Sequence, residues 1–135
     1  MRNRSLSVDT SSTRIVDLTS RLEEFLSELE GDGLLNVFVP HATAGLAMME
    51  TGSGSEGDLE DAVERLLPRS HAYGHQHGSP GHGADHLLPA FLSPALTLPV
   101  WEGAMRLGTW QSVVLVDLNQ DNPHRTVHVS FLGHR

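Results

Sequence analysis

The sequence contains no cysteine and no lysine. Without cysteine the chain cannot form disulfide bonds, use a thiolate nucleophile or bind zinc or iron–sulfur clusters through sulfur. Without lysine, nine arginines are the only strongly basic side chains beside 17 acidic ones, and the formal net charge is −8 with histidine neutral. Dense phosphate repels a chain of this charge, so we expect binding to neither nucleic acid nor anionic membranes.

Long apolar runs are also missing. No segment approaches the roughly 20 apolar residues that span a bilayer, and the first nine residues lack the apolar core of a signal peptide. These features predict a cytoplasmic protein. The length of 135 residues predicts a single domain over residues 1–135.

Apolar periodicity predicts an α+β fold with a mostly antiparallel sheet. A capping box, Ser20 with Glu23, is expected to start the first helix, and Gly31–Gly33 to end it. We expect helices over residues 20–29, 56–67 and 84–91. We expect about seven strands, including residues 5–8, 14–18, 34–39, 42–49, 95–100, 113–118 and 126–131.

Histidine is the residue type in clearest excess, with nine in the chain. Neutral imidazole is a common zinc ligand, and a catalytic zinc site usually has three protein ligands and one open position. His41, His75 and His86 come from separate predicted elements, as an open site requires, so they are candidate ligands for a divalent ion, zinc first. Spacing alone leaves His71, His77 and His82 open, and a solvated, adventitiously metal-binding loop is the alternative.

Several other polar side chains suggest chemistry, each with a structural alternative. Glu50 ends an apolar run and is a candidate general base or a partner that orients an imidazole. Asp58 is explained by the helix dipole alone. Arg125 could hold phosphate through a bidentate contact, although an arginine at a strand edge is more often solvated. Trp110 and Gln111 suggest a ligand contact, or a core aromatic and a backbone hydrogen bond.

Five stretches resemble, in chain order, motifs of the YjbQ family, also called secondary thiamine-phosphate synthase. They are His41–Leu46 (His-Ala-Thr-Ala-Gly-Leu), Pro68–His75 (Pro-x-x-His-x-Tyr-x-His), Ala84–His86, Ser93–Gln111 ending in Gly-Thr-Trp-Gln, and Arg125–Val127 (Arg-x-Val). Two departures stand out. Ala42 and Thr43 occupy the family's Thr and Ser positions, and residues 51–55 replace its usual Asn-x-Asp-Pro stretch.

The resemblance implies a β-sandwich-like α+β fold that assembles as a homotrimer, and Trp101 and Trp110 lie in β segments that could face a neighbour. It implies that His41, His75 and His86 gather around a metal ion. The implied activity is thiamine-phosphate synthesis as a secondary, low-level activity, which joins a hydroxymethylpyrimidine diphosphate to a thiazole phosphate and releases diphosphate.

We therefore expect a metal-dependent enzyme acting on a phosphorylated or otherwise anionic small molecule. Glu50 is the candidate catalytic residue. The candidate substrate-binding residues are Thr43, Gly108, Thr109, Trp110, Gln111 and Arg125. A metal could act as Lewis acid on a leaving diphosphate or activate water, so a transferase and a hydrolase of unknown substrate both stay open. The alternatives are a non-catalytic trimer that binds metal or a small molecule, and a partner-binding domain.

Overall fold

The computed structural model describes residues 1–75 and 78–133, so His77 lies outside the described residues. Within them the chain forms eight strands and three helices. The strands are β1 (Arg2–Asp9), β2 (Ile15–Asp17), β3 (Gly33–Phe38), β4 (Gly45–Met49), β5 (Ala95–Trp101), β6 (Ala104–Met105), β7 (Ser112–Val116) and β8 (His124–Gly133). The helices are α1 (Thr19–Ser27), α2 (Ser55–Leu66) and α3 (His82–Phe91). No helix in these ranges is long and apolar enough to cross a membrane.

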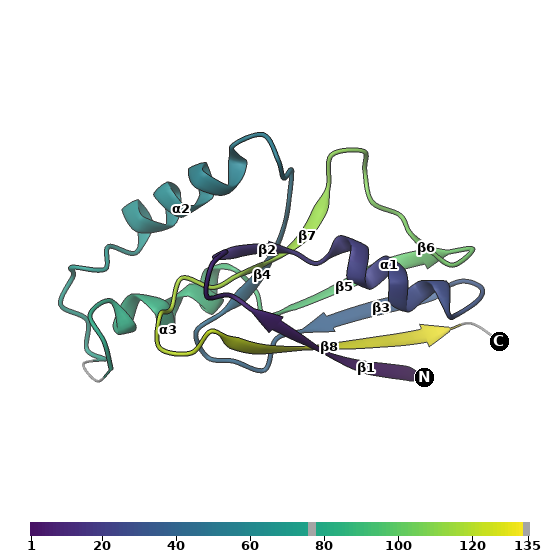
Figure 1. Ribbon diagram of the computed structural model, residues 1–135, viewed down its shortest axis with the longest axis horizontal. Coiled ribbons are helices and arrows are strands. Elements are labelled where there is room, and N and C mark those ends of the chain that lie inside the picture. Colours follow the sequence, from purple (N-terminus) through teal and green to yellow (C-terminus); the bar gives the residue numbers. More distant parts are fainter. Residues whose placement is uncertain (76–77, 134–135) are drawn as a thin grey trace.

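The strands form two sheets, one of five strands in the order β1-β8-β3-β5-β6 and one of three in the order β2-β7-β4 (Figure 1). Every strand pair in the described residues is antiparallel. The first and last strands are neighbours, with Arg2 opposite Phe131, which places both ends of the described chain at one edge of the molecule. The expected α+β class with packed antiparallel sheets is confirmed.

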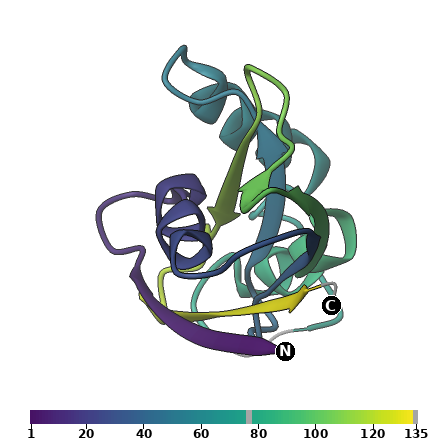
Figure 2. The same cartoon turned by 90° about the vertical axis from the view of Figure 1, so that its right-hand side faces the viewer.

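β7 lies in the middle layer of the molecule. Its alternate residues Val113 and Leu115 belong to the core between the five-stranded sheet and α1. Val114 and Val116, on the opposite face of the strand, pack in a second core with residues of α2 and α3. Figure 2 shows α1 and the two later helices on different sides of the three-stranded sheet. Because both faces of β7 are buried, its sequence is a continuous apolar run rather than an alternating one.

The expected capping box is wrong. α1 begins at Thr19, and neither Ser20 nor Glu23 caps it, because its N-cap makes no side-chain hydrogen bond. Instead, the Thr19 amide donates to Asp17 Oδ1 at 2.9 Å, and the Val113 amide donates to Thr19 Oγ1 at 2.9 Å. A local hydrogen bond to Asp17 and a tertiary hydrogen bond from β7 therefore fix the start of this helix. Its predicted apolar stripe does form, and its central residues are buried in the main core.

Two element boundaries differ from expectation in ways that matter for the site. The strand expected over residues 42–49 starts only at Gly45, after a turn. A β-carbon at Gly45 would collide with the carbonyl of Leu92, just past α3, so this close approach requires glycine. The last helix starts at His82, two residues earlier than predicted. His82 and His86 therefore share one helix.

Candidate metal centre

Three imidazoles converge where α3 begins. His82 and His86 are four residues apart on α3, and their Nε2 atoms are 2.8 Å apart. His75, from the preceding loop, stacks on His86 with ring centroids 4.0 Å apart, and its ring lies 5.0 Å from that of His82. One ring nitrogen from each of the three lies within 4.8 Å of the others. The structure thus brings together two of the predicted ligands, His75 and His86, and adds His82.

The loop that carries His75 is held against its own start. The Tyr73 hydroxyl donates to the Pro68 carbonyl at 2.7 Å, and burial raises the pKa of this phenol. The His71 ring meets the Tyr73 ring edge-on at 4.7 Å, so His71 packs on the tyrosine and is not a member of the three-histidine group. These contacts, together with the packing of Tyr73 against the second core, order the loop up to His75.

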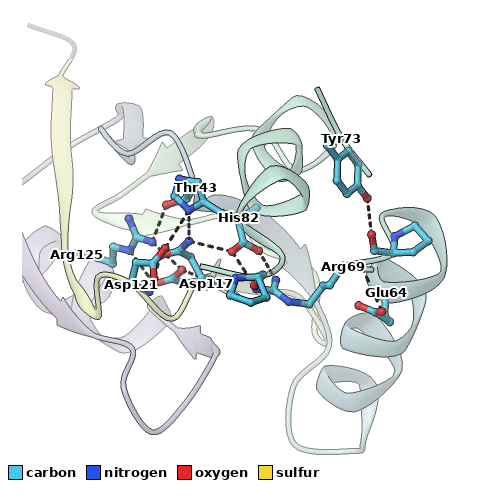
Figure 3. A network of polar contacts seen from close by, with 12 residues as sticks. Thr43, Glu64, Arg69, Tyr73, His82, Asp117, Asp121 and Arg125 are labelled. Carbon is cyan, nitrogen blue, oxygen red and sulfur yellow. Dashed lines mark hydrogen bonds and ion pairs between the residues drawn. The ribbon is translucent and has the colours of Figure 1, made fainter. Parts of the chain in front are cut away.

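His82 contacts an acidic group through its second ring nitrogen. Its Nδ1 lies 3.0 Å from Asp121 Oδ2. The neighbouring Ser79 and, more weakly, His82 hold the pKa of Asp121 below its ordinary value, and partial desolvation opposes this shift. Asp121 is therefore an ionised acceptor at neutral pH. Figure 3 shows Asp121 and His82 within one continuous polar network that runs from Arg125 to Arg69.

A buried ion pair lies next to His82, one helical turn further along α3. Asp85 is almost fully buried, forms an ion pair with the Arg69 guanidinium and accepts a hydrogen bond from Asn119 Nδ2 at 2.9 Å. The hydrogen bond to Asp85 is the main cause of the raised pKa of Arg69. This arginine is thus already neutralised by a fixed countercharge, which lowers its attraction for an external anion.

Arg125 and Thr43, both expected to bind substrate, lie in the interior. Arg125 is 3% exposed. Its Nε donates to Asp117 Oδ2 at 2.7 Å, and one terminal nitrogen donates to Asp117 Oδ1 at 2.9 Å and to Thr43 Oγ1 at 2.8 Å. Thr10 Oγ1 also donates to Asp117 Oδ2, at 2.6 Å. All of these contacts of the Arg125 guanidinium are internal, and the four side chains connect β8 and the turn before β4 with the residues that directly follow β1 and β7.

His41 is not a member of the three-histidine group in the described residues. Its Nε2 accepts a hydrogen bond from the backbone amide of Thr126 at 2.9 Å, which extends the ladder of β8 beyond the end of β3. Burial and the nearby positive charge of Arg125 lower the pKa of His41. The ring is therefore neutral at physiological pH, with its proton on Nδ1, as an Nε2 acceptor requires.

The other predicted residues lie away from the histidines. The Gly108 amide donates to Gln111 Oε1 at 2.7 Å and the Gln111 amide donates to the Gly108 carbonyl at 3.1 Å, so the two residues close their own turn. Thr109 and Trp110 are exposed at its tip. Figure 1 shows this segment between β6 and β7, at the far side of the molecule from α3. Glu50 is exposed just after β4.

The sequence profile of the UPF0047 proteins, described as YjbQ-like, matches residues 4–134. The chain belongs to the UPF0047 family. A UPF0047 protein of Mycobacterium bovis is 62% identical over 127 residues, which cover 94% of this chain and 98% of that protein. The resemblance to YjbQ motifs is thereby confirmed at the level of the family.

Solved structures agree with this assignment. A hypothetical protein from Aeropyrum pernix K1 matches with a TM-score of 0.89 and 31% identity, over 99% of this chain and 100% of that one. A YbjQ-like protein of unknown function from Sulfolobus solfataricus P2 matches with a TM-score of 0.91 and 27% identity, over 98% and 97% of the two chains. The UPF0047 fold thus spans essentially the whole chain.

In this UPF0047 chain, sequence reasoning left His82 open and did not find Asp121. The signal for His82 was its spacing of four residues from His86, which places both side chains on one helical face. This signal applies only because α3 begins at His82 rather than at the expected residue 84. Asp121 had no comparable signal, because its contact with His82 joins residues 39 positions apart in the sequence.

Proposed function

We propose that this UPF0047 chain is a metal-dependent enzyme whose His75, His82 and His86 bind one divalent transition ion, with zinc the leading candidate. The convergence of their three ring nitrogens within 4.8 Å carries the proposal. Ligand nitrogens around tetrahedral zinc are about 3.3 Å apart, as follows from Zn–N bonds of about 2.0–2.1 Å. Small side-chain adjustments therefore suffice for binding. Three nitrogen ligands leave one position open, the arrangement typical of catalytic zinc.

A cavity beside the group supports a small molecule as its ligand. It has a volume of about 470 Å³ and is lined by residues that include Arg69, His71, Tyr73, His75 and His82. Cavities that bind small molecules usually fall between roughly 300 and 1,000 Å³. A bound divalent ion would supply Lewis acidity toward a phosphate oxygen. Because Arg69 is paired with Asp85, we propose that the ion carries most of the charge that attracts an anionic ligand.

The activity proposed for this site is a transferase reaction of the thiamine-phosphate synthase type, and the YjbQ motifs are its support. Glu50 stays the proposed proton carrier. Its exposed position after β4 favours the alternative of a non-catalytic metal- or small-molecule-binding protein, and a hydrolase of unknown substrate would use the same ion. We further propose that the chain acts in the cytoplasm as a homotrimer, which would cover Trp101 and Trp110, now 55% and 73% exposed.

Metal analysis tests the binding site. The chain should be purified without affinity tag or chelator, and the metal bound per chain measured by mass spectrometry. We expect one ion per chain in the wild type and in His124→Ala, an exposed-histidine control, and none in His82→Ala. Retention in His41→Ala would support the group seen here. Loss in His41→Ala with retention in His82→Ala would restore the ligand set expected from sequence, and no metal in the wild type would reject the site.

An activity assay tests the proposed transferase reaction and the role of Glu50, and a mass measurement tests the proposed homotrimer. The pyrimidine diphosphate and thiazole phosphate should be supplied together to metal-loaded wild type and Glu50→Ala, and diphosphate release followed. We expect release by the wild type that falls in the variant. Equal rates would remove Glu50 from catalysis, and no release by the wild type would favour the binding protein. Light scattering at micromolar concentration should give three times the chain mass of 14.7 kDa, and a monomer mass would reject the trimer.

A further inference from the structure

The contact between His82 and Asp121 determines which nitrogen of His82 faces its neighbours. Asp121 Oδ2 lies 3.0 Å from Nδ1, while Nε2 faces His86 Nε2 at 2.8 Å. An ionised carboxylate can only accept a hydrogen bond, so the Nδ1 beside it must carry a proton. In a neutral ring the lone pair is then on Nε2. This is the nitrogen that takes part in the three-histidine group.

A second polar group near Nδ1 does not compete. Asn119 Nδ2 lies 3.4 Å from His82 Nδ1, which is long for a hydrogen bond. The same amide nitrogen donates to Asp85 Oδ2 at 2.9 Å, and the Asn119 side-chain oxygen accepts from the Asp121 amide at 2.9 Å. These two bonds fix the orientation of the Asn119 amide group. Asp121 is therefore better placed than Asn119 to set the tautomer of His82.

The position of Asp121 is set from the interior of the protein. The backbone amide of Asp121 donates to the side-chain oxygen of Asn119, and the backbone amide of Asn119 donates to Asp117 Oδ1 at 3.1 Å. Asp117 is held in turn by the buried guanidinium of Arg125. A chain of hydrogen bonds thus runs from the core to the turn before β8, as Figure 3 shows. This anchoring explains how an acidic residue on a surface turn keeps one fixed geometry.

We infer that Asp121 is a positioning residue of the metal centre, which holds His82 with Nε2 directed at the ion and increases the affinity for it. The inference rests on the metal site proposed above. Carboxylates that accept a hydrogen bond from a metal-bound histidine typically contribute about 10- to 100-fold in metal affinity. The Asp121 side chain is 39% exposed. Because water competes for this hydrogen bond, we expect the lower end, about tenfold.

Two measurements on the same variants test this role. The first records the imidazole ¹⁵N shifts of His82 in metal-free protein, which report the tautomer without any metal. The second measures zinc affinity by competition with a chelating dye. The variants are Asp121→Ala, which removes the acceptor, and Asp121→Asn, whose amide oxygen can still accept but carries no charge. Asp61→Asn, on the exposed face of α2, is the control for the change in net charge.

We expect His82 to carry its proton on Nδ1 in the wild type and in Asp61→Asn. In Asp121→Ala this preference should be lost and zinc affinity should fall about tenfold, with Asp121→Asn between the two. An unchanged tautomer with unchanged affinity in Asp121→Ala would overturn the inference and leave the metal site standing. If the wild type binds no zinc, the proposed function fails. A loss of the Nδ1–H tautomer in Asp121→Ala would then still support Asp121 as the residue that orients His82.

Discussion

Gly83 of α3 lies directly against the backbone of His75. A β-carbon at Gly83 would lie 3.0 Å from the His75 carbonyl oxygen and 2.7 Å from the β-carbon of Tyr73. The missing side chain lets the loop pack on the first turn of the helix. The imidazole of His75 thereby reaches those of the helix, so the three-histidine group depends on a residue with no chemistry of its own.

Replacing Gly83 by alanine should separate the loop from the helix. The added methyl group forces a backbone shift, so we expect a loss of about 1–3 kcal/mol in the free energy of unfolding together with weaker zinc binding. Gly57→Ala is a matched control, because Gly57 is also in the first turn of a helix but has open space around it. Alanine there should stabilise by up to about 1 kcal/mol and leave zinc affinity unchanged. Equal zinc affinity in both variants would contradict the packing role of Gly83.

Gly45 should be as intolerant of a side chain, for a different reason. The Leu46 amide donates to the Ser93 carbonyl at 2.8 Å, which draws the start of β4 onto the end of α3. A methyl group at Gly45 would meet the Leu92 carbonyl and break this approach. We expect Gly45→Ala to lower the free energy of unfolding by about 1–3 kcal/mol, measured by urea titration. If Gly45→Ala unfolds at the same urea concentration as the wild type, the close contact between Gly45 and Leu92 is contradicted.

Removing Arg125 should damage stability before it affects any ligand. Arg125→Met leaves the Asp117 carboxylate buried without its countercharge, and such changes cost about 3–5 kcal/mol. Arg4→Met removes the exposed ion pair with Glu28 and should cost no more than about 1 kcal/mol. Urea unfolding of the two variants makes the comparison. A stable Arg125→Met protein that has lost binding of an anionic ligand would return Arg125 to the substrate-binding role expected from sequence.

Lowering the pH should reduce the free energy of unfolding through protonation of His41. Its pKa is lowered in the folded protein, so the unfolded chain binds more protons as pH falls below about 6.5. The contribution of neutral His41 to stability is complete above that pH and is lost as pH falls from there toward the folded pKa. Glutamine can still accept the Thr126 amide but does not titrate in this range. His41→Gln should therefore lose less stability than wild type between pH 7.5 and 5.5.

The comparison requires chemical unfolding at each pH and a second histidine variant. His124→Gln changes an exposed ring at the start of β8 and should follow the wild-type pH dependence closely. If His41→Gln follows the wild type as well, the Thr126 hydrogen bond has no share in acid sensitivity.

Most secondary structure was predictable because it follows from local periodicity. The buried stripe of α1, the alternating buried face of β8 and the apolar strand β3 all lie where the sequence indicates. Errors occurred at element ends, where contacts with distant segments decide. Val113, 94 positions along the chain, donates to Thr19 at the start of α1, and the turn over residues 42–44 precedes the close approach of Gly45 to Leu92.

The ligand type of the candidate site was predictable from the sequence, but the particular residues that form it were not. The excess of histidine and the lack of cysteine pointed to an imidazole site, and His75 and His86 are in it. His41 and Arg125 have side chains equally suited to metal or phosphate, but the fold uses them for internal hydrogen bonds. Residue type cannot distinguish these uses, because a buried donor or acceptor must be satisfied by whatever group the fold brings near it.

The amino-acid sequence by itself determined the class of fold, the run of strands and helices, and the nitrogen character of any metal site, since these depend on composition and on short-range spacing. Only the tertiary structure decided which three imidazoles meet, that Asp121 contacts His82 and that Arg125 is buried in the interior. Those choices depend on contacts between segments tens of residues apart. Packing of the sheets and α3 creates these contacts, and local sequence patterns do not predict them.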